Sequence, residues 1–227
     1  MSRDTVLFDI NETVLDLSAL RPRFENTFGN PAVAATWFAT LLHSSTVCAL
    51  TGVRTGFADL ARIALEAVAA RRGIEISPEN RDAILGGFAA LAPHGDVRPA
   101  LEKLRRHGFQ TVAFTNSSIG LVNSQIANAG LDDVFDQIIS VEKTGTFKPD
   151  AQVYRYAAER LGKPMRELRL VAAHDWDTHG ALSAGLLAAY IDRSGSPYHP
   201  LYRRPDIFET SMADTADRII SMAEAQD

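Results

Sequence analysis

The sequence is poor in cysteine and has no excess of positive charge. Cys48 is the only cysteine among 227 residues, so no disulfide can form within the chain, and a reducing compartment is favoured. Lys and Arg total 23 against 28 Asp and Glu, which gives a formal net charge of −5 at pH 7 and argues against a nucleic-acid-binding surface. The sequence shows no charged-then-apolar leader, and no apolar run near the roughly 18 residues of a membrane span. We therefore expect a cytoplasmic protein with no nucleic-acid or membrane partner.

Apolar residues are abundant, and their spacing predicts an α/β fold. Hydrophobic residues make up 46% of the chain, which is ample for a buried core. Strands are predicted at 5–9, 111–114, 137–141, 168–173 and 188–191, and helices between them at 98–107, 119–129, 151–161 and 178–184. This alternation implies a Rossmann-like parallel sheet with helices on both faces.

The chain after the first strand has a different pattern. Helices are predicted at 32–50, 57–72 and 78–91, where apolar residues recur at helical spacing. We therefore expect two domains, a Rossmann-like core of residues 1–15 and 95–227 and an inserted helical domain of residues 16–94. The segment 194–205 is rich in Pro, Ser, Tyr and Arg and is predicted to be an irregular loop.

The first predicted strand ends at an acidic residue, Asp9, directly after the apolar run 6–8. In open α/β sheets, ligands bind at the carboxyl ends of the strands. A carboxylate at that position, with Thr13 shortly after it, is a candidate nucleophile. The alternative interpretation is an ordinary loop acid or the N-cap of a helix.

Three later segments place polar residues at other predicted strand ends or helix starts. They are Phe114-Thr115-Asn116-Ser117, Phe147-Lys148-Pro149-Asp150, and residues 170–177, which end in His174-Asp175-Trp176-Asp177 and precede Gly180-Ala181. Together with the segment after Asp9, they resemble in order the four motifs of the haloacid dehalogenase (HAD) superfamily. This resemblance spans residues 6–181. It implies the HAD fold, with the helical insertion as the cap domain.

Phosphatases of this superfamily carry a second aspartate two residues after the nucleophile, and Asn11 stands there in this chain. An amide cannot serve as a general acid. The phosphatases also hold Mg²⁺ with an acid pair in the fourth motif. Here Asp177 matches the later acid, while Ala172 and Ala173 stand at the earlier position. A Mg²⁺-dependent phosphatase acting on a small phosphate ester is therefore the alternative rather than the first hypothesis.

Displacement of a halide has different requirements, because a halide leaves as a stable anion without a general acid. The sequence Lys148-Pro149-Asp150, the following Val153-Tyr154 and the pair Trp176-Asp177 resemble the metal-independent L-2-haloacid dehalogenases. This resemblance implies hydrolysis of small 2-haloalkanoic acids to 2-hydroxy acids through an aspartyl ester on Asp9. It further implies no cofactor or metal, and a possible homodimer. A binding protein without activity is a second rival, and the intact Asp9, Lys148 and Asp177 argue against it.

The resemblance also implies roles for individual residues. Thr13 and Thr115 are expected to hydrogen-bond the nucleophile Asp9, and Asn116 to receive the substrate carboxylate. Lys148 is expected to keep Asp9 ionised.

Two further roles concern residues around Lys148. Asp177 is expected to pair with Lys148 and to help activate water for ester hydrolysis. Tyr154 is expected to orient Lys148 or face the substrate, and packing of its ring in the core is an equal alternative.

The chain departs from the dehalogenase pattern at three places, and one of them is Ala172, which stands where the family has a Ser in the fourth motif. The family carries an Arg beside a Trp in the first cap helix, whereas here Trp37 is followed by Phe38, and both are expected at the substrate. The family's Asn in the fourth motif is replaced by His174, which can act as a hydrogen-bond donor, as the base for water, or only as a core histidine. The candidates for the missing cation are Arg21, Arg54 and His43.

Overall fold

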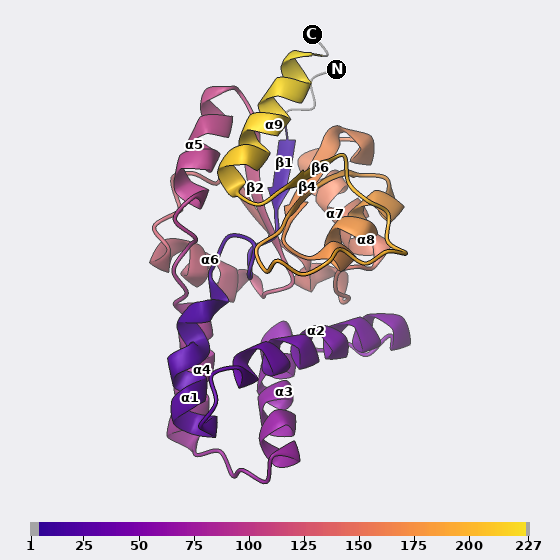
Figure 1. Cartoon of the computed structure of the whole chain (residues 1–227). Coiled ribbons are helices and arrows are strands. Elements are labelled where there is room, and N and C mark those ends of the chain that lie inside the picture. Colours follow the sequence, from indigo (N-terminus) through magenta and orange to yellow (C-terminus); the bar gives the residue numbers. More distant parts are fainter. Residues whose placement is uncertain (1–4, 226–227) are drawn as a thin grey trace.

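A computed structural model describes residues 5–225, and it contains one parallel sheet of six strands in the order β3-β2-β1-β4-β5-β6 (Figure 1). The strands are β1 (Thr5–Phe8), β2 (Gln110–Thr115), β3 (Gln137–Ser140), β4 (Leu168–Ala172), β5 (Leu187–Ile191) and β6 (Ile207–Glu209). The α/β fold class predicted from the sequence is confirmed.

Strand β1 lies at the centre of the sheet. All four of its residues are buried, and Leu7 lies between Val112 of β2 and Leu170 of β4. A strand covered on both faces and paired on both edges needs a continuous apolar sequence, which β1 has. The chain leaves β1 toward β2, and later continues from β4 toward the opposite edge. The carboxyl end of β1 is therefore the topological switch point of the sheet.

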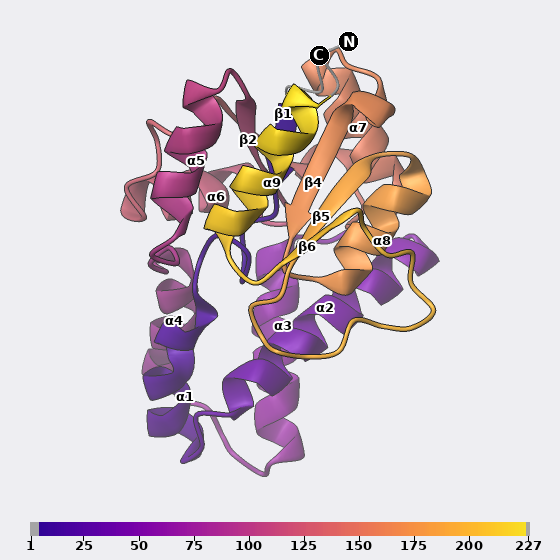
Figure 2. The ribbon, with the colours of Figure 1, turned by 45° about the horizontal axis from the view of Figure 1, so that its top comes forward.

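Helices cover both faces of the sheet (Figure 2). The helices that follow the strands are α5 (Val97–Arg106), α6 (Ile119–Asn128), α7 (Ala151–Leu161), α8 (Asp175–Ala184) and α9 (Met212–Glu224). Helix α9 packs against α5, and α7 packs against α8 on the other face. Two short 3-10 helices, Val141–Thr144 and Met165–Glu167, precede α7 and β4.

The sequence analysis missed the last two elements, β6 and α9. Strand β6 has three residues and follows an irregular segment, so its pattern was too short to recognise. Helix α9 buries Ala216, Ile219 and Ile220 at helical spacing, a signal that was present in the sequence and was not used.

A helical segment separates β1 from α5. It consists of a 3-10 helix (Leu17–Leu20) followed by α1 (Arg21–Phe28), α2 (Val33–Thr51), α3 (Phe57–Arg71) and α4 (Pro78–Ala89). Figure 1 shows these helices beyond the carboxyl end of β1. Their packing centres on Trp37, which is fully buried and lies 5.4 Å from the ring of Phe24 and 5.6 Å from that of Phe88. The segment thus has an aromatic core of its own, directly above the sheet's ligand-binding edge.

Helix α2 differs from the expectation that the chain has no apolar run near the length of a membrane span. An 18-residue window of this 19-residue helix has a mean hydropathy of 1.4, so by length and composition the helix could cross a membrane, and it is the one such helix among residues 5–225. Its apolar residues Trp37, Phe38 and Leu41 are buried against neighbouring helices. The same composition is found in core helices of globular domains, so this feature is weak evidence for a membrane span.

Candidate active site

Asp9 occupies the first position after β1, at the switch point of the sheet. Its N–H donates to the carbonyl oxygen of Val171 at 3.0 Å, which continues the pairing with β4. Its side chain is 8% exposed. Asn116 follows β2 and His174 follows β4, so the parallel strands bring these residues to the same edge.

The ammonium group of Lys148 lies at the centre of a buried cluster. Its Nζ is 3.1 Å from Oδ1 of Asp9, 2.8 Å from Oδ2 of Asp177 and 2.9 Å from the carbonyl oxygen of Phe114. The Lys148 side chain is 1% exposed. A buried cation is tolerated only when its donors are satisfied, and here two carboxylates and a carbonyl accept from it.

The charged groups in this cluster shift one another's pKa values. Burial by itself would raise the pKa of Asp9, but Lys148 and His174 hold that pKa well below its usual range. Burial would lower the pKa of Lys148, and the two carboxylates raise it instead. Burial raises the pKa of Asp177 above its usual value. The neighbouring cations therefore favour the ionised form of Asp9.

Tyr154 hydrogen-bonds Asp177 and is buried in the core, which agrees with the core-packing alternative for this residue. Its hydroxyl donates to Oδ1 of Asp177 at 2.6 Å, and the side chain is completely buried. Burial raises the pKa of Tyr154 well above its usual value, so the hydroxyl keeps its proton. Tyr154 therefore neither faces a substrate nor orients Lys148 directly. It fixes the carboxylate that holds Lys148.

Asp177 is also completely buried, with Lys148 on one oxygen and Tyr154 on the other. The expected pairing with Lys148 is confirmed. Direct contact between Asp177 and a water molecule at Asp9 does not fit this burial.

Thr13 is placed as expected. Its hydroxyl donates to Oδ2 of Asp9 at 2.8 Å, and its oxygen accepts from the N–H of Ala173 at 2.9 Å. Thr115 is not placed as expected. Its hydroxyl accepts from the N–H of Ser117 at 3.1 Å, which stabilises the turn after β2, and the described chain gives it no hydrogen bond to Asp9. The Thr115 side chain is fully buried.

Asn116 has a structural partner on its side-chain oxygen. Oδ1 accepts from the backbone N–H of Lys148 at 2.9 Å, which ties the loop after β2 to the loop that carries Lys148. The amide Nδ2 makes no hydrogen bond within residues 5–225 and is left as a donor. The residue is 7% exposed.

His174 lies against Asp9. Its Nδ1 is 3.2 Å from Oδ2 of Asp9, and its Nε2 is 2.8 Å from Oε2 of Glu12. Burial would lower the pKa of His174, but hydrogen bonds to the two carboxylates raise it from 6.5 to about 10. The imidazole is thus a charged donor near pH 7. This arrangement favours the hydrogen-bond donor among the three roles expected for His174.

Glu12 is a site residue that the sequence analysis missed. Its backbone has φ of 65°, and it is the one non-glycine residue at positive φ in the described chain. This left-handed conformation costs an L residue about 1–2 kcal/mol. The N–H of Glu12 donates to Leu15 and its carbonyl oxygen lies 3.0 Å from Nε2 of His94, which together hold the turn. The sequence did offer a signal for this residue, because Glu12 is an acidic residue three positions after the candidate nucleophile Asp9.

A cavity of about 430 Å³ lies beside this cluster, between the helical segment and the sheet. His174, Glu12 and Ala173 line its floor, and Trp37 and Phe38 line it from α2. The indole N–H of Trp37 already donates to the carbonyl oxygen of Ala61, so Trp37 offers only its ring to the cavity. The cavity is therefore apolar on the α2 side and polar on the sheet side.

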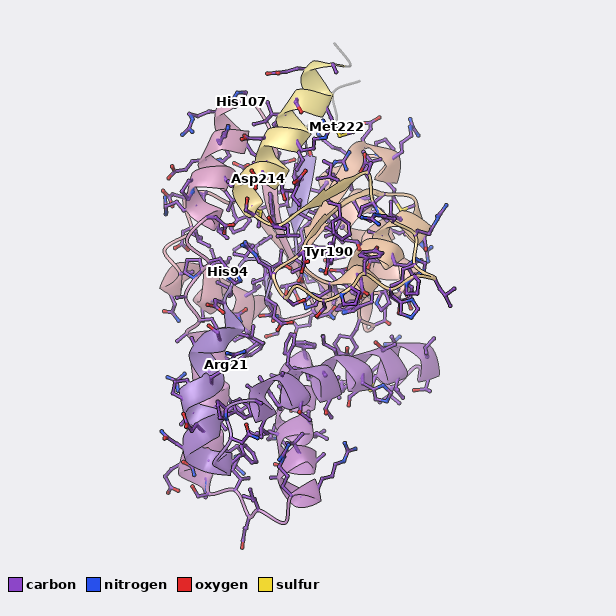
Figure 3. The ribbon with its side chains drawn as sticks, in the orientation of Figure 1. Arg21, His94, His107, Tyr190, Asp214 and Met222 are labelled. Atoms are coloured by element: carbon purple, nitrogen blue, oxygen red, sulfur yellow. The ribbon has the colours of Figure 1, made fainter. Side chains whose placement is uncertain are left out.

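Of the three candidate cations, Arg21 alone lines the cavity. Figure 3 shows Arg21 and His94 at the junction between the helical segment and the sheet. Arg54 instead lies against Gly145. No group of three or more His, Cys, Asp or Glu residues in the described chain is arranged to hold a metal ion.

The family model for haloacid dehalogenase-like hydrolases matches residues 3–185. The chain belongs to this family. The (S)-2-haloacid dehalogenase of Pseudomonas sp. (strain YL) is 26% identical over 209 residues, which cover 91% of this chain and 90% of that protein. Haloacetate dehalogenase H-2 of Moraxella sp. (strain B) is 22% identical, with coverage of 96% and 98%. The structure of L-2-haloacid dehalogenase from Xanthobacter autotrophicus with chloropropionic acid covalently bound matches with a TM-score of 0.90 at 22% identity, covering 96% of this chain and 99% of that one.

Within this haloacid dehalogenase-like hydrolase, Asn11 belongs to a buried amide network. Its Nδ2 donates to Oγ of Ser117 at 3.3 Å, and its Oδ1 accepts from Nε2 of Gln125 at 3.2 Å. The residue is 4% exposed. The position two residues after Asp9 therefore supplies neither a proton nor a free carboxylate.

Proposed function

We propose that this protein hydrolyses small 2-haloalkanoic acids to 2-hydroxyalkanoic acids through an ester on Asp9, without a metal ion. The observation that carries the proposal is the state of Asp9. It is an ionised carboxylate between Lys148 and His174, beside a cavity lined in part by apolar side chains. A carboxylate in this state suits attack on carbon, and Asn11 offers no acid for an alcohol leaving group.

The relatives support this choice of reaction. The proteins named (S)-2-haloacid dehalogenase cover most of this chain and are matched over most of their own length. The Xanthobacter structure with covalently bound chloropropionic acid is a precedent for a covalent step on this fold.

The reaction proceeds in two displacements. One oxygen of Asp9 attacks the carbon that bears the halogen, and the carbon–halogen bond breaks with its electron pair leaving on the halide. Water then attacks Cγ of the aspartyl ester and the ester C–O bond breaks, which releases the 2-hydroxy acid and one proton. The alcohol oxygen of the product therefore comes from Asp9, and the oxygen of water enters the Asp9 carboxylate.

Lys148 keeps Asp9 ionised in the resting enzyme, because its positive charge offsets the free-energy cost of burying the Asp9 carboxylate. Asp177 and Tyr154 act through Lys148, because both side chains are completely buried and hydrogen-bond each other. The cations Lys148 and His174 already occupy both oxygens of Asp9, which supports a reaction without a divalent ion.

For the substrate carboxylate we propose two donors. Nδ2 of Asn116 is available beside Asp9, because Oδ1 of the same amide is fixed by Lys148. Arg21 lines the cavity from the start of α1 and makes no ion pair within the described chain, so it takes the place of the missing cap Arg. Trp37 and Phe38 contribute apolar walls for the alkyl group.

We also propose that the core and cap domains are residues 1–15 with 95–227, and 16–94. We further propose that the protein acts in the cytoplasm as a homodimer, with neither membrane nor nucleic-acid partners. Exposed apolar side chains on α2 and α3, including Leu50 at 83% and Ile63 at 47%, support an interface between copies. Sedimentation equilibrium of wild type and of Leu50→Asp tests the dimer.

The decisive experiment measures halide release from a panel of 2-haloalkanoates, beside phosphate release from p-nitrophenyl phosphate. Halide release together with ¹⁸O incorporation into Asp9 during a single turnover in ¹⁸O-water is the expected result. Phosphate release that requires Mg²⁺, with no halide release, would replace the proposal by the phosphatase alternative.

A further inference from the structure

The two oxygens of the Asp9 carboxylate are held differently. Within residues 5–225, Oδ1 accepts one hydrogen bond, from Nζ of Lys148. Oδ2 accepts from the hydroxyl of Thr13 at 2.8 Å and lies 3.2 Å from Nδ1 of His174. The other ring nitrogen of His174 lies 2.8 Å from Oε2 of Glu12. Only a doubly protonated imidazole can donate to both carboxylates at once.

We propose that Thr13 and His174 bind the carbonyl oxygen of the aspartyl ester while it is hydrolysed, and that Glu12 is a positioning residue that keeps His174 doubly protonated at that stage. This inference rests on the proposed function. Oδ1 carries fewer donors, so it attacks the substrate and becomes the ester oxygen, and Oδ2 becomes the carbonyl oxygen. Two donors then already face the atom on which negative charge develops.

The hydrolytic step conserves atoms and charge. The oxygen of water bonds to Cγ of Asp9, and the π electrons of the carbonyl group move to Oδ2, which becomes an oxyanion held by Thr13 and His174. The carbonyl group then re-forms and the Cγ–Oδ1 bond breaks. Oδ1 leaves on the substrate carbon and takes one proton of the water to become the product hydroxyl. The second proton is released to solvent, and Asp9 regains its carboxylate.

Glu12 matters because formation of the ester removes the negative charge of Asp9 from beside His174. In the resting enzyme the carboxylates of Asp9 and Glu12 both face His174, whereas in the intermediate Asp9 is an ester and only the Glu12 carboxylate remains beside the imidazole. The backbone of Glu12 supports a functional rather than a structural reason for this residue. At φ of 65° a glycine fits without cost, so a glutamate is disfavoured there except for what its side chain contributes.

His174 is held firmly in this position. Its ring stacks on Trp176 with centroids 5.1 Å apart and lies 6.2 Å from the ring of Phe38. Other charged or titratable groups near it are Lys148 beyond Asp9, and Asp16, Arg21, His94 and Arg193 around the cavity. All of them are retained when only the carboxylate of Glu12 is removed, so a change in His174 can be assigned to Glu12.

The experiment combines an NMR titration with a kinetic measurement on the full chain. Histidine-selective ¹⁵N labelling follows the ring of His174 in wild type, Glu12→Gln and Glu12→Gly, with His174→Asn for assignment. Glu25→Gln, at an exposed position on α1, is the matched control. We expect both Glu12 variants to lower the pKa of His174 by about 1 to 3, and the control to leave it unchanged.

The kinetic arm uses 2-chloropropionate in single turnovers, with intact-protein mass spectrometry to detect the ester. In Glu12→Gln the ester is expected to accumulate as pH rises, by about tenfold per pH unit above the lowered pKa, while its formation rate is nearly unchanged. Glu12→Gly separates this effect from misfolding, because its backbone fits the turn.

The two possible failures are distinguishable. If wild type releases halide but Glu12→Gln has the wild-type titration of His174 and the wild-type ester lifetime, the inference is overturned and the proposed function stands. If wild type forms no ester and releases no halide, the proposed function and the oxyanion role fail together, and the titration still decides whether Glu12 controls His174.

Discussion

Gly180 of α8 and Tyr154 of α7 are packed so closely that no side chain fits between them. A Cβ atom on Gly180 would lie 2.6 Å from the hydroxyl oxygen of Tyr154 and 2.6 Å from Cβ of Pro149. Pro149 follows Lys148, and Tyr154 holds Asp177. Residue 180 therefore packs against Pro149, the neighbour of Lys148, and against Tyr154, the hydrogen-bond partner of Asp177.

Gly180→Ala is expected to destabilise the protein by about 1–3 kcal/mol, because the methyl group overpacks a rigid contact. It should also lower kcat, since Tyr154 and Pro149 must move. Gly86→Ala is the control, because Gly86 lies in α4 with nothing within 4 Å of its would-be Cβ, and this change should stabilise by roughly 0.5–1 kcal/mol. Urea unfolding of both variants measures the difference. Equal stability of the two would contradict the packing argument.

Asp9→Asn is expected to lower turnover by roughly 10³-fold or more while the fold is retained. The amide is near-isosteric with the carboxylate but is a poor nucleophile. Halide release and far-UV circular dichroism measure the two effects, with the exposed Asp132→Asn as control. Activity at a few per cent of wild type or above would mean that Asp9 is not the nucleophile.

Lys148→Ala is expected to be more damaging than Lys148→Arg. Removal of the cation leaves two buried carboxylates without their partner, at a cost of about 3–5 kcal/mol. Lys148 lowers the pKa of Asp9, so its loss raises that pKa, and Asp9 becomes protonated at higher pH. The acidic limb of the pH–rate profile should therefore move to higher pH in Lys148→Ala. An acidic limb at the wild-type position would show that Lys148 does not act on the nucleophile.

Addition of Mg²⁺ or EDTA is expected to leave the rate of halide release unchanged. Lys148 and His174 already neutralise Asp9, and the Asp177 carboxylate is used by Lys148 and Tyr154. A hard divalent ion needs several free oxygen ligands, which this cluster does not offer. The rate is measured after dialysis against EDTA and again after metal is restored. A loss that Mg²⁺ restores would contradict the prediction.

His174 should make the stability of the protein fall at alkaline pH. Its pKa is raised from 6.5 to about 10 in the folded protein. A raised pKa contributes stability that is fully present below the unfolded value and is lost as pH rises through the folded value. The free energy of unfolding of wild type should thus decline between about pH 6.5 and 10 relative to His174→Asn. Urea titrations across this range test it, and parallel curves for the two proteins would show that His174 gains no proton affinity on folding.

The local sequence determined the strands, the helices and most of the nucleophile's surroundings. The apolar run of β1 favours a buried strand, which predicts that Asp9 lies at the ligand-binding edge of the sheet. Thr13 reaches Asp9 through a short turn, which local geometry controls. The pairing of Lys148 with Asp177 follows from their opposite charges, because charged side chains are buried only when they are paired.

The hydrogen-bond partners of the other site residues depend on tertiary packing. Glu12 and His174 are 162 residues apart and meet only because β1 and β4 are adjacent and Glu12 takes a left-handed conformation. The proton affinity of His174 depends on its contact with Glu12, so it could not be predicted from the fourth motif alone. The hydrogen-bond partners of Tyr154 and Thr115 could not be predicted from the sequence for the same reason. Their type and position fit the site, but side-chain direction is set by packing across elements, which leaves Tyr154 behind Asp177 and turns Thr115 toward its own loop.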